Sequence, residues 1–98
     1  MIKVIYLYRG FSPICEFLNR QINESGIKDK VKFESIILEY RPGFGEFYKI
    51  SGWHTVIFED QDGNILQRID KPFSSEDLKI ALEASEDQIR GDENKWYM

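Results

Sequence analysis

Apolar residues occur along the chain in two kinds of pattern, short continuous or alternating runs and runs with helical spacing. The short runs predict four strands. Residues Ile2–Tyr8 are almost continuously apolar and rich in branched and aromatic side chains, which is typical of a central strand covered on both faces. Residues Val31–Leu38 alternate before they become apolar, which predicts a second strand. Thr55–Phe58 and Ile65–Ile69 flank an Asp62-Gly63 pair, and this combination predicts an antiparallel hairpin.

Apolar residues at helical spacing predict a helix between the first two strands. Ser12 supplies an N-cap, and Pro13 follows at the first helical position, where its missing N–H would have had no intrahelical partner. Apolar residues then recur at every fourth position, at Ile14, Leu18 and Ile22. Gly26 provides a left-handed stop. A strand–helix–strand unit of this kind is normally parallel and right-handed.

Two further helices are predicted in the second half of the chain. The few apolar residues within Glu46–Ser51 are spaced as in a helix, and they predict a short helix only. We interpret the preceding Gly43–Gly45 as a turn, because it lacks the strand–loop–helix context and the lysine of a phosphate-binding loop. The segment Ser74–Asp77 is a capping box, after which an apolar stripe leads toward Gly91.

The predicted elements follow the order β-α-β and then α-β-β-α. This order predicts an α/β fold with a mixed four-stranded sheet. Residues 1–90 would form one domain, and residues 91–98 a C-terminal tail. The tail begins with polar residues that we expect to be frayed, whereas Trp96-Tyr97-Met98 is unusually apolar for such a position.

The size, composition and charge of the chain exclude several classes of protein. A chain of 98 residues can form one modest core, and 42% apolar with 31% charged residues is ordinary globular usage. The net charge of −4 gives little support to nucleic-acid binding. No apolar stretch approaches the roughly 20 residues that cross a bilayer. The single cysteine, Cys15, excludes an internal disulfide and a cysteine-based zinc site. We therefore expect a cytoplasmic protein with no nucleic-acid or membrane partner and no metal.

The order of elements and two sequence segments resemble the thioredoxin and glutaredoxin fold, over nearly the whole chain up to about Glu86. The first segment is Val4–Tyr8 followed by Ser12-Pro13-Ile14-Cys15. It is similar to the family's strand and Cys-x-x-Cys motif, with serine in place of the first cysteine. The second segment, Tyr48–Phe58, is similar to the family's helix end and cis-proline loop, and a hairpin follows it. The resemblance implies a thioredoxin-like, three-layer α/β/α fold.

Two departures from the family pattern fall on positions that the family uses for catalysis. Its first cysteine is activated by the helix N-terminus and attacks disulfides as a thiolate. That position is Ser12 here, and a serine hydroxyl is a weak nucleophile that cannot form a disulfide. The family's cis-proline aligns with His54. A cis bond before a non-proline residue costs about 3 kcal/mol, so we expect the Trp53–His54 bond to be trans.

Three side chains are candidates for chemistry at this place, and each has two interpretations. Cys15 would take the third helical position; we favour a small buried hydrophobe over a reactive thiol that attacks glutathione mixed disulfides. We favour Ser12 as an N-cap over a hydroxyl that stabilises a bound glutathione thiolate, as in glutathione transferases, which the motif also faintly resembles. We favour His54 as a hydrogen-bonded surface residue over a base that takes the proton of Cys15.

The leading hypothesis from these residues is a degenerate thioredoxin-like domain that has no dithiol exchange and works as a protein-binding module. Another protein would bind through the aromatic tail or through the surface around the motif, formed by Ser12, Pro13, Ile14, Cys15, Trp53, His54 and Thr55. Phe11 and Phe44 are further aromatic candidates for such a surface. The alternative is an enzyme, a monothiol glutaredoxin-like oxidoreductase with Cys15 as nucleophile and His54 as base. No cofactor is expected in the first case, and glutathione in the second.

Overall fold

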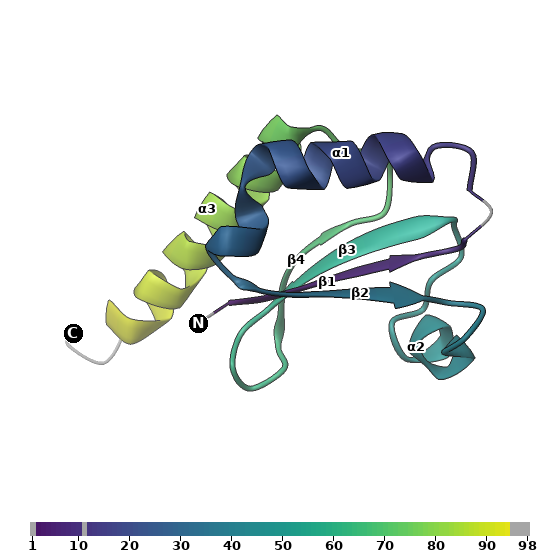
Figure 1. Ribbon diagram of the computed structural model, residues 1–98. Coiled ribbons are helices and arrows are strands. Elements are labelled where there is room, and N and C mark those ends of the chain that lie inside the picture. The colour runs from purple at the N-terminus through teal and green to yellow at the C-terminus, as the bar shows by residue number, and fades with distance from the viewer. Residues whose placement is uncertain (1, 11, 95–98) are drawn as a thin grey trace.

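Four strands form the centre of the computed structural model, which describes residues 2–10 and 12–94 (Figure 1). They are β1 (Lys3–Tyr8), β2 (Lys32–Ile37), β3 (His54–Glu59) and β4 (Ile65–Ile69). Their order in the sheet is β2-β1-β3-β4, with β1 parallel to β2 and the β1–β3 and β3–β4 pairs antiparallel. The mixed sheet, the parallel first unit and the antiparallel hairpin are therefore as predicted, and β1 is a central strand because both of its edges are paired.

Helices cover the sheet on both faces. Helices α1 (Cys15–Ser25) and α3 (Ser75–Asn94) lie over one face, and the short α2 (Pro42–Phe47) lies on the other (Figure 1). A single 3-10 turn, Ile27–Asp29, joins α1 to β2. The predicted three-layer α/β/α arrangement is confirmed.

Each face of the sheet has its own core, because side chains on a strand alternate between the faces. On the side of α1 and α3, Tyr6 and Phe58 are fully buried, and Leu18, Ile22 and Leu78 of the two helices pack on them. The smaller core on the side of α2 comprises Ile5, Leu7, Ile36, Leu38, Tyr48 and Ile57. Burial of each aliphatic side chain contributes about 1.5–3 kcal/mol, so the larger core carries most of the hydrophobic stabilisation.

Two predicted helix-end signals have the expected geometry. The Ser74 N–H donates to the Asp77 carboxylate at 2.9 Å, and the Asp77 N–H donates to the Ser74 Oγ at 3.2 Å, so the capping box at the start of α3 is reciprocal. Gly26 ends α1 with a φ of 71°, a left-handed conformation that glycine adopts without the Cβ clash of other residues.

The start of α1 differs from the prediction, because α1 begins at Cys15 and not at Pro13. Ile14 is the N-cap residue, with φ −105° and ψ 5°, and no side chain caps this helix end. The Ser12 N–H donates to the Arg9 carbonyl at 3.1 Å, and the Cys15 N–H donates to the Ser12 carbonyl at 3.2 Å. The predicted N-cap role of Ser12 is therefore wrong. Successive turns hold residues 12–14, and a proline fits such a turn as well as it fits a first helical position.

The other two helices also differ from the prediction in their bounds. Helix α2 spans Pro42–Phe47 and not Glu46–Ser51, so Gly43–Gly45 is helical and not a turn. A proline in the first turn of a helix loses no hydrogen bond, because its position has no intrahelical donor to supply. The sequence pattern did not predict a helix start at Pro42, because two of the next three residues are glycines, which are typical of turns. Helix α3 continues through Gly91 to Asn94, so residues 91–94 are helical and not a frayed tail. No helix in the described part of the chain combines the length and apolar character that a membrane span requires.

Candidate functional site

The candidate site lies at the end of the sheet where β1 finishes and β3 begins. Tyr8, the last residue of β1, pairs with His54, the first residue of β3. The next residue, Arg9, donates its backbone N–H to the Trp53 carbonyl at 2.9 Å and its side-chain Nε to the Gly52 carbonyl at 3.2 Å. These bonds hold the segment that leads to Ser12–Cys15 beside the loop that leads into β3.

Cys15 is the first residue of α1 and is half-buried. Its sulfur accepts a hydrogen bond from the Asn19 side-chain amide, one turn further along the helix, at 3.6 Å. Two expectations are therefore wrong, because Cys15 is not at the third helical position and is not a fully buried hydrophobe. Free N–H groups give the start of a helix a partial positive charge that attracts anions.

Two tyrosines of β1, Tyr6 and Tyr8, lie close to Cys15. Tyr6 is fully buried, and its ring stacks on that of Tyr8 with 4.8 Å between the centroids. Burial raises the pKa of Tyr6 far above its usual value, and the neighbouring Cys15 raises it further. Burial, followed by Cys15 and then Glu39, also raises the pKa of Tyr8. The Tyr6 hydroxyl lies near the Cys15 sulfur, but it has no well-aligned hydrogen-bond partner among the described residues.

His54 is buried, with 7% of its surface exposed, and neither ring nitrogen has a hydrogen-bond partner in the described part of the chain. Its ring meets Phe73 edge to face, with 6.4 Å between the centroids. Burial lowers the pKa of His54, and the Lys71 backbone and the Asp70 charge oppose this only in part. The interpretation of His54 as a hydrogen-bonded surface histidine is wrong. No hydrogen bond within residues 2–10 and 12–94 joins it to Cys15.

The residues on either side of His54 face different surroundings. Trp53 is 54% exposed, and the Trp53–His54 bond is trans, as expected. Thr55 is buried, and its hydroxyl donates to the Asp70 carboxylate at 2.9 Å. His54 and Thr55 are therefore inaccessible to a partner, although both were assigned to the predicted binding surface.

Solvent reaches the remaining residues of the motif to different degrees. Pro13 is exposed and Ser12 is half-buried, whereas the half-buried Ile14 packs against the larger core. We therefore define the helix-tip surface as Ser12, Pro13, Cys15 and Trp53. Phe11, Trp96 and Tyr97, which were further aromatic candidates, lie outside the described residues.

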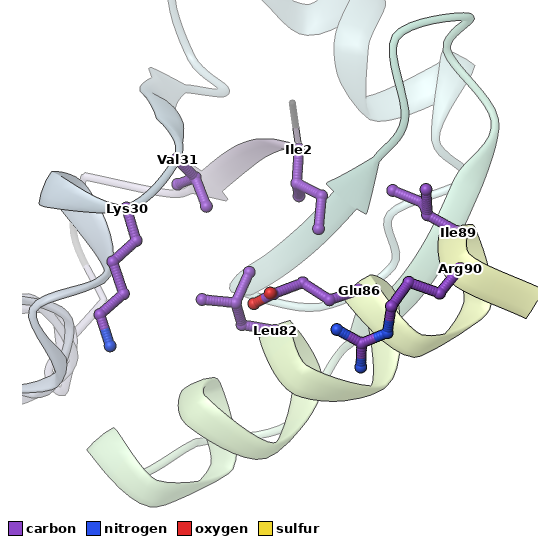
Figure 2. A pocket seen from close by; sticks show the side chains of 7 residues that line it. All are labelled: Ile2, Lys30, Val31, Leu82, Glu86, Ile89 and Arg90. Atoms are coloured by element: carbon purple, nitrogen blue, oxygen red, sulfur yellow. The ribbon is translucent and has the colours of Figure 1, made fainter.

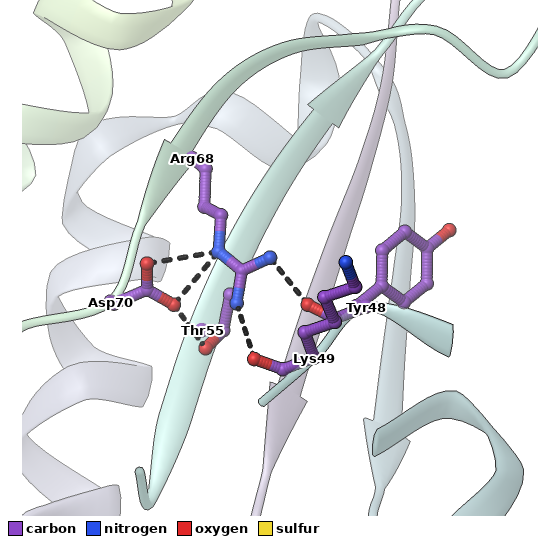
Figure 3. A network of polar contacts seen from close by, with 5 residues as sticks. All are labelled: Tyr48, Lys49, Thr55, Arg68 and Asp70. Carbon is purple, nitrogen blue, oxygen red and sulfur yellow. Dashed lines mark hydrogen bonds and ion pairs between the residues drawn. The ribbon is translucent and has the colours of Figure 1, made fainter. Parts of the chain in front are cut away.

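A network centred on Arg68 supports the loop that carries Trp53, and the sequence analysis missed it (Figure 3). The guanidinium of Arg68 donates its Nε to both carboxylate oxygens of Asp70, at 3.0 and 2.9 Å. It also donates to the backbone carbonyls of Tyr48 and Lys49, the latter at 3.2 Å. The hydrogen bond from Arg68 holds the pKa of Asp70 below its usual value. The only signal in the sequence is that Asp70 follows Arg68 by two residues, directly after the end of β4, and this spacing does not reveal the contact with the residues that follow α2.

A buried polar pair lies beside this network. The Tyr48 hydroxyl donates to the Glu59 carboxylate at 2.7 Å. Burial, followed by this hydrogen bond, raises the pKa of Tyr48 far above its usual value. Among residues 2–10 and 12–94, no three histidine, cysteine or acidic side chains lie together in a way that could hold a metal ion.

Comparison with known proteins supports the fold. No family model matches the sequence, and no curated protein matches it. Thioredoxin 1 of the thermophilic eubacterium Thermosipho africanus has a TM-score of 0.74 at 17% identity, over 90% of this chain and 98% of that one. Thioredoxin-2, a component of the malaria parasite protein secretion machinery, has a TM-score of 0.75 at 15% identity, over 85% of this chain and 82% of that one. The thioredoxin of Fasciola hepatica has a TM-score of 0.71 at 12% identity, over 85% of this chain and 80% of that one. The chain therefore has the thioredoxin-like fold.

Proposed function

We propose that this thioredoxin-like domain carries out no dithiol exchange and binds another protein through the helix-tip surface. Dithiol exchange needs two thiols, and the sequence has one cysteine. The serine at position 12 cannot close a disulfide with Cys15. The cytoplasm, or another reducing compartment, suits a domain with one free thiol.

The observation that carries this proposal is the exposure of Trp53 beside the helix tip. An indole that is 54% exposed presents a large apolar area to solvent, and tryptophan is enriched among the residues that dominate interface energies. Two hydrogen bonds from Arg9 fix the loop that carries it. A loop backbone held in this way loses little conformational entropy when a partner binds to it.

Binding of a selected peptide tests this proposal. Peptides would be selected from a display library on the wild-type domain and measured by isothermal titration calorimetry. We expect Trp53→Ala to weaken binding at least about tenfold, the loss typical of a hot-spot residue. Ile80→Ala is the control, because Ile80 is 56% exposed on α3, away from the helix tip. Equal affinity of both variants for every selected peptide would contradict the proposal.

The half-exposed position of Cys15 at the start of α1 favours a second candidate function, a monothiol glutathione-linked oxidoreductase. The Cys15 thiolate would attack the glutathione sulfur of a mixed disulfide, release the substrate thiolate and form a Cys15–glutathione disulfide. The thiolate of a free glutathione would then attack this disulfide, release glutathione disulfide and regenerate Cys15. The structure brings Tyr6 and Asn19 close to this sulfur, and it supplies no hydrogen bond from His54.

The rate of thiol alkylation as a function of pH discriminates the two candidates. A free cysteine has a pKa of about 8.5. A catalytic thiolate should react with iodoacetamide well below that pH, already below pH 8. A thiol without a catalytic role should react only as the pH approaches that value. Reduction of a glutathione mixed disulfide, with turnover abolished in Cys15→Ser, would contradict the binding-module proposal and support the enzyme.

A further inference from the structure

The outer edge of β2 is an unpaired edge of the sheet. Strand β2 comes first in the order β2-β1-β3-β4 and pairs with β1 only. The N–H groups of Lys32 and Leu38 donate toward β1, at 3.1 and 2.9 Å. Backbone groups alternate in direction along a strand, so those of Phe33 and Ser35 point to the outer edge. Within the described chain, no turn or loop supplies a backbone hydrogen bond to them.

The two faces of β2 carry different side chains. Val31, directly before β2, lines a groove between the start of β1 and α3 (Figure 2), and Phe33 packs against the larger core on the same side. Lys32 and Glu34 lie on the other face, because side chains alternate along a strand. There Glu34 pairs with Lys3 at 3.3 Å. Lys32 has no ion-pair partner among residues 2–10 and 12–94.

The charges of β2 are complementary to those of a second copy of β2 that runs antiparallel to it. Opposed residues in such a pair direct their backbone groups to the same side, so the two-fold axis passes through a residue of β2 and its own copy. An axis at Phe33 places Lys32 opposite the Glu34 of the other copy, once in each direction. An axis at Lys32 or at Glu34 would oppose like charges, which is destabilising. An axis at Ser35 would oppose Glu34 and Ile36. Only the axis at Phe33 therefore pairs opposite charges.

The axis at Phe33 also suits the backbone. Phe33 would exchange two hydrogen bonds with its own copy, because its N–H and C=O point to the outer edge. Val31 would exchange hydrogen bonds with the Ser35 of the other copy in the same way. The two Phe33 rings would lie next to each other, and aromatic pairs across two strands are stabilising.

Lysine in an edge strand is a common device against pairing with other chains. In β2 the device is cancelled, because Glu34 supplies a partner for the Lys32 of a second copy. The opposite edge strand, β4, has no such pattern. Its one charged residue is Arg68, which is already bound to Asp70 and to the turn after α2. The charge pattern therefore distinguishes the two edges of the sheet.

We propose that two copies of this chain form a symmetric dimer in which the outer edges of their β2 strands pair antiparallel, with the two-fold axis at Phe33. The two sheets then form one continuous sheet. Phe33 lies beside Val4, near the start of β1, whereas the helix-tip surface lies beyond the end of β1. Both helix-tip surfaces of the dimer therefore stay accessible. One strand from each copy is a smaller contact than the roughly 1,200 Å² of stable complexes, so the dimer is weak.

Charge reversal tests the proposal on the full chain by sedimentation equilibrium, at concentrations up to about 1 mM. Lys32→Glu opposes two acidic residues in each pair, and Glu34→Lys opposes two lysines. Each variant alone should raise the dissociation constant of the dimer at least about tenfold. A mixture of the two variants should recover most of the wild-type affinity, because the mixed dimer has opposite charges in both pairs. The control is Lys79→Glu, which makes the same charge change at an exposed position of α3.

Three results of this experiment would overturn the proposal. The first is a wild-type chain that stays monomeric up to about 1 mM. The second is an equal effect of Lys32→Glu and Lys79→Glu, which would assign self-association to net charge or to another surface. The third is a mixture of Lys32→Glu and Glu34→Lys that associates no more strongly than either variant alone.

A second measurement reads the register of the two strands directly. Isotope-filtered NOE spectra would be recorded on a mixture of labelled and unlabelled wild-type chains. Lys32 and Glu34 of the two copies would form a non-hydrogen-bonded pair, with Cα atoms about 4.5 Å apart, so we expect a strong intermolecular NOE between their Hα protons. Ser35→Pro should abolish this NOE, because it removes an N–H of the outer edge that the monomer does not use. Intermolecular NOEs confined to other surfaces would contradict the proposal.

Discussion

Arg68 of β4 donates a hydrogen bond to the backbone carbonyl of Lys49 at 3.2 Å, and Lys49 has a φ of 55°. A positive φ is unfavourable for a residue with a Cβ and persists where the surroundings impose it. The same guanidinium pairs with Asp70. Arg68 therefore fixes the turn after α2, and through this turn it positions the loop that carries Trp53.

Arg68→Ala should lower the free energy of unfolding by about 2 kcal/mol, because the carbonyls of Tyr48 and Lys49 lose a charged donor. Arg68→Lys should recover only part of this loss, since an ammonium cannot reproduce the planar arrangement of donors. Urea unfolding would measure both effects. Arg20→Ala, at an exposed position of α1, is the control and should change stability little. An equal loss in Arg20→Ala and Arg68→Ala would argue against the network.

The lowered pKa of His54 predicts that the domain loses stability as the pH falls below the histidine's unfolded pKa, about 6.5. Between the folded and unfolded pKa values the unfolded chain binds the extra proton, so protonation favours unfolding. His54 is the only histidine, and the slope of stability between about pH 7.5 and 5.5 should therefore disappear in His54→Leu. Unfolding in urea at several pH values would show this. A slope that persists in His54→Leu would contradict the assignment.

Two buried tyrosines should respond in opposite ways to replacement by phenylalanine. The Tyr6 hydroxyl has no partner among the described residues, so Tyr6→Phe should be neutral or slightly stabilising. The Tyr48 hydroxyl donates to the buried carboxylate of Glu59, so Tyr48→Phe should cost about 1–3 kcal/mol. Thermal or urea unfolding compares the pair directly. Similar losses in both variants would show that Tyr6 has a partner after all.

Two serines near helix starts should also differ. Ser74 accepts the Asp77 N–H of the capping box, so Ser74→Ala should lower stability by about 1 kcal/mol. Ser12 caps no helix in this structure, so Ser12→Ala should have little effect on the same measurement. A loss of similar size in Ser12→Ala would restore the prediction that the first helix begins at Pro13.

The sequence alone determined the order of the elements, because that order depends on short-range patterns. The continuous apolar run of β1, the Asp62-Gly63 turn, the Gly26 stop and the Ser74–Asp77 capping box each act within a few residues. These patterns were sufficient to predict the mixed sheet, and the resemblance to thioredoxins added the three layers. The same resemblance placed the Ser12–Cys15 segment and the Trp53 loop in one region.

Only the tertiary structure decided how each residue of that region is exposed and partnered. Pro13 is compatible with a turn and with a first helical position, so the start of α1 depended on the hydrogen bonds from Ser12 and Cys15. The burial of His54 depends on Phe73, and the position of Lys49 depends on Arg68, 19 residues away. Such contacts join residues far apart in the chain, and no periodicity of apolar positions encodes them.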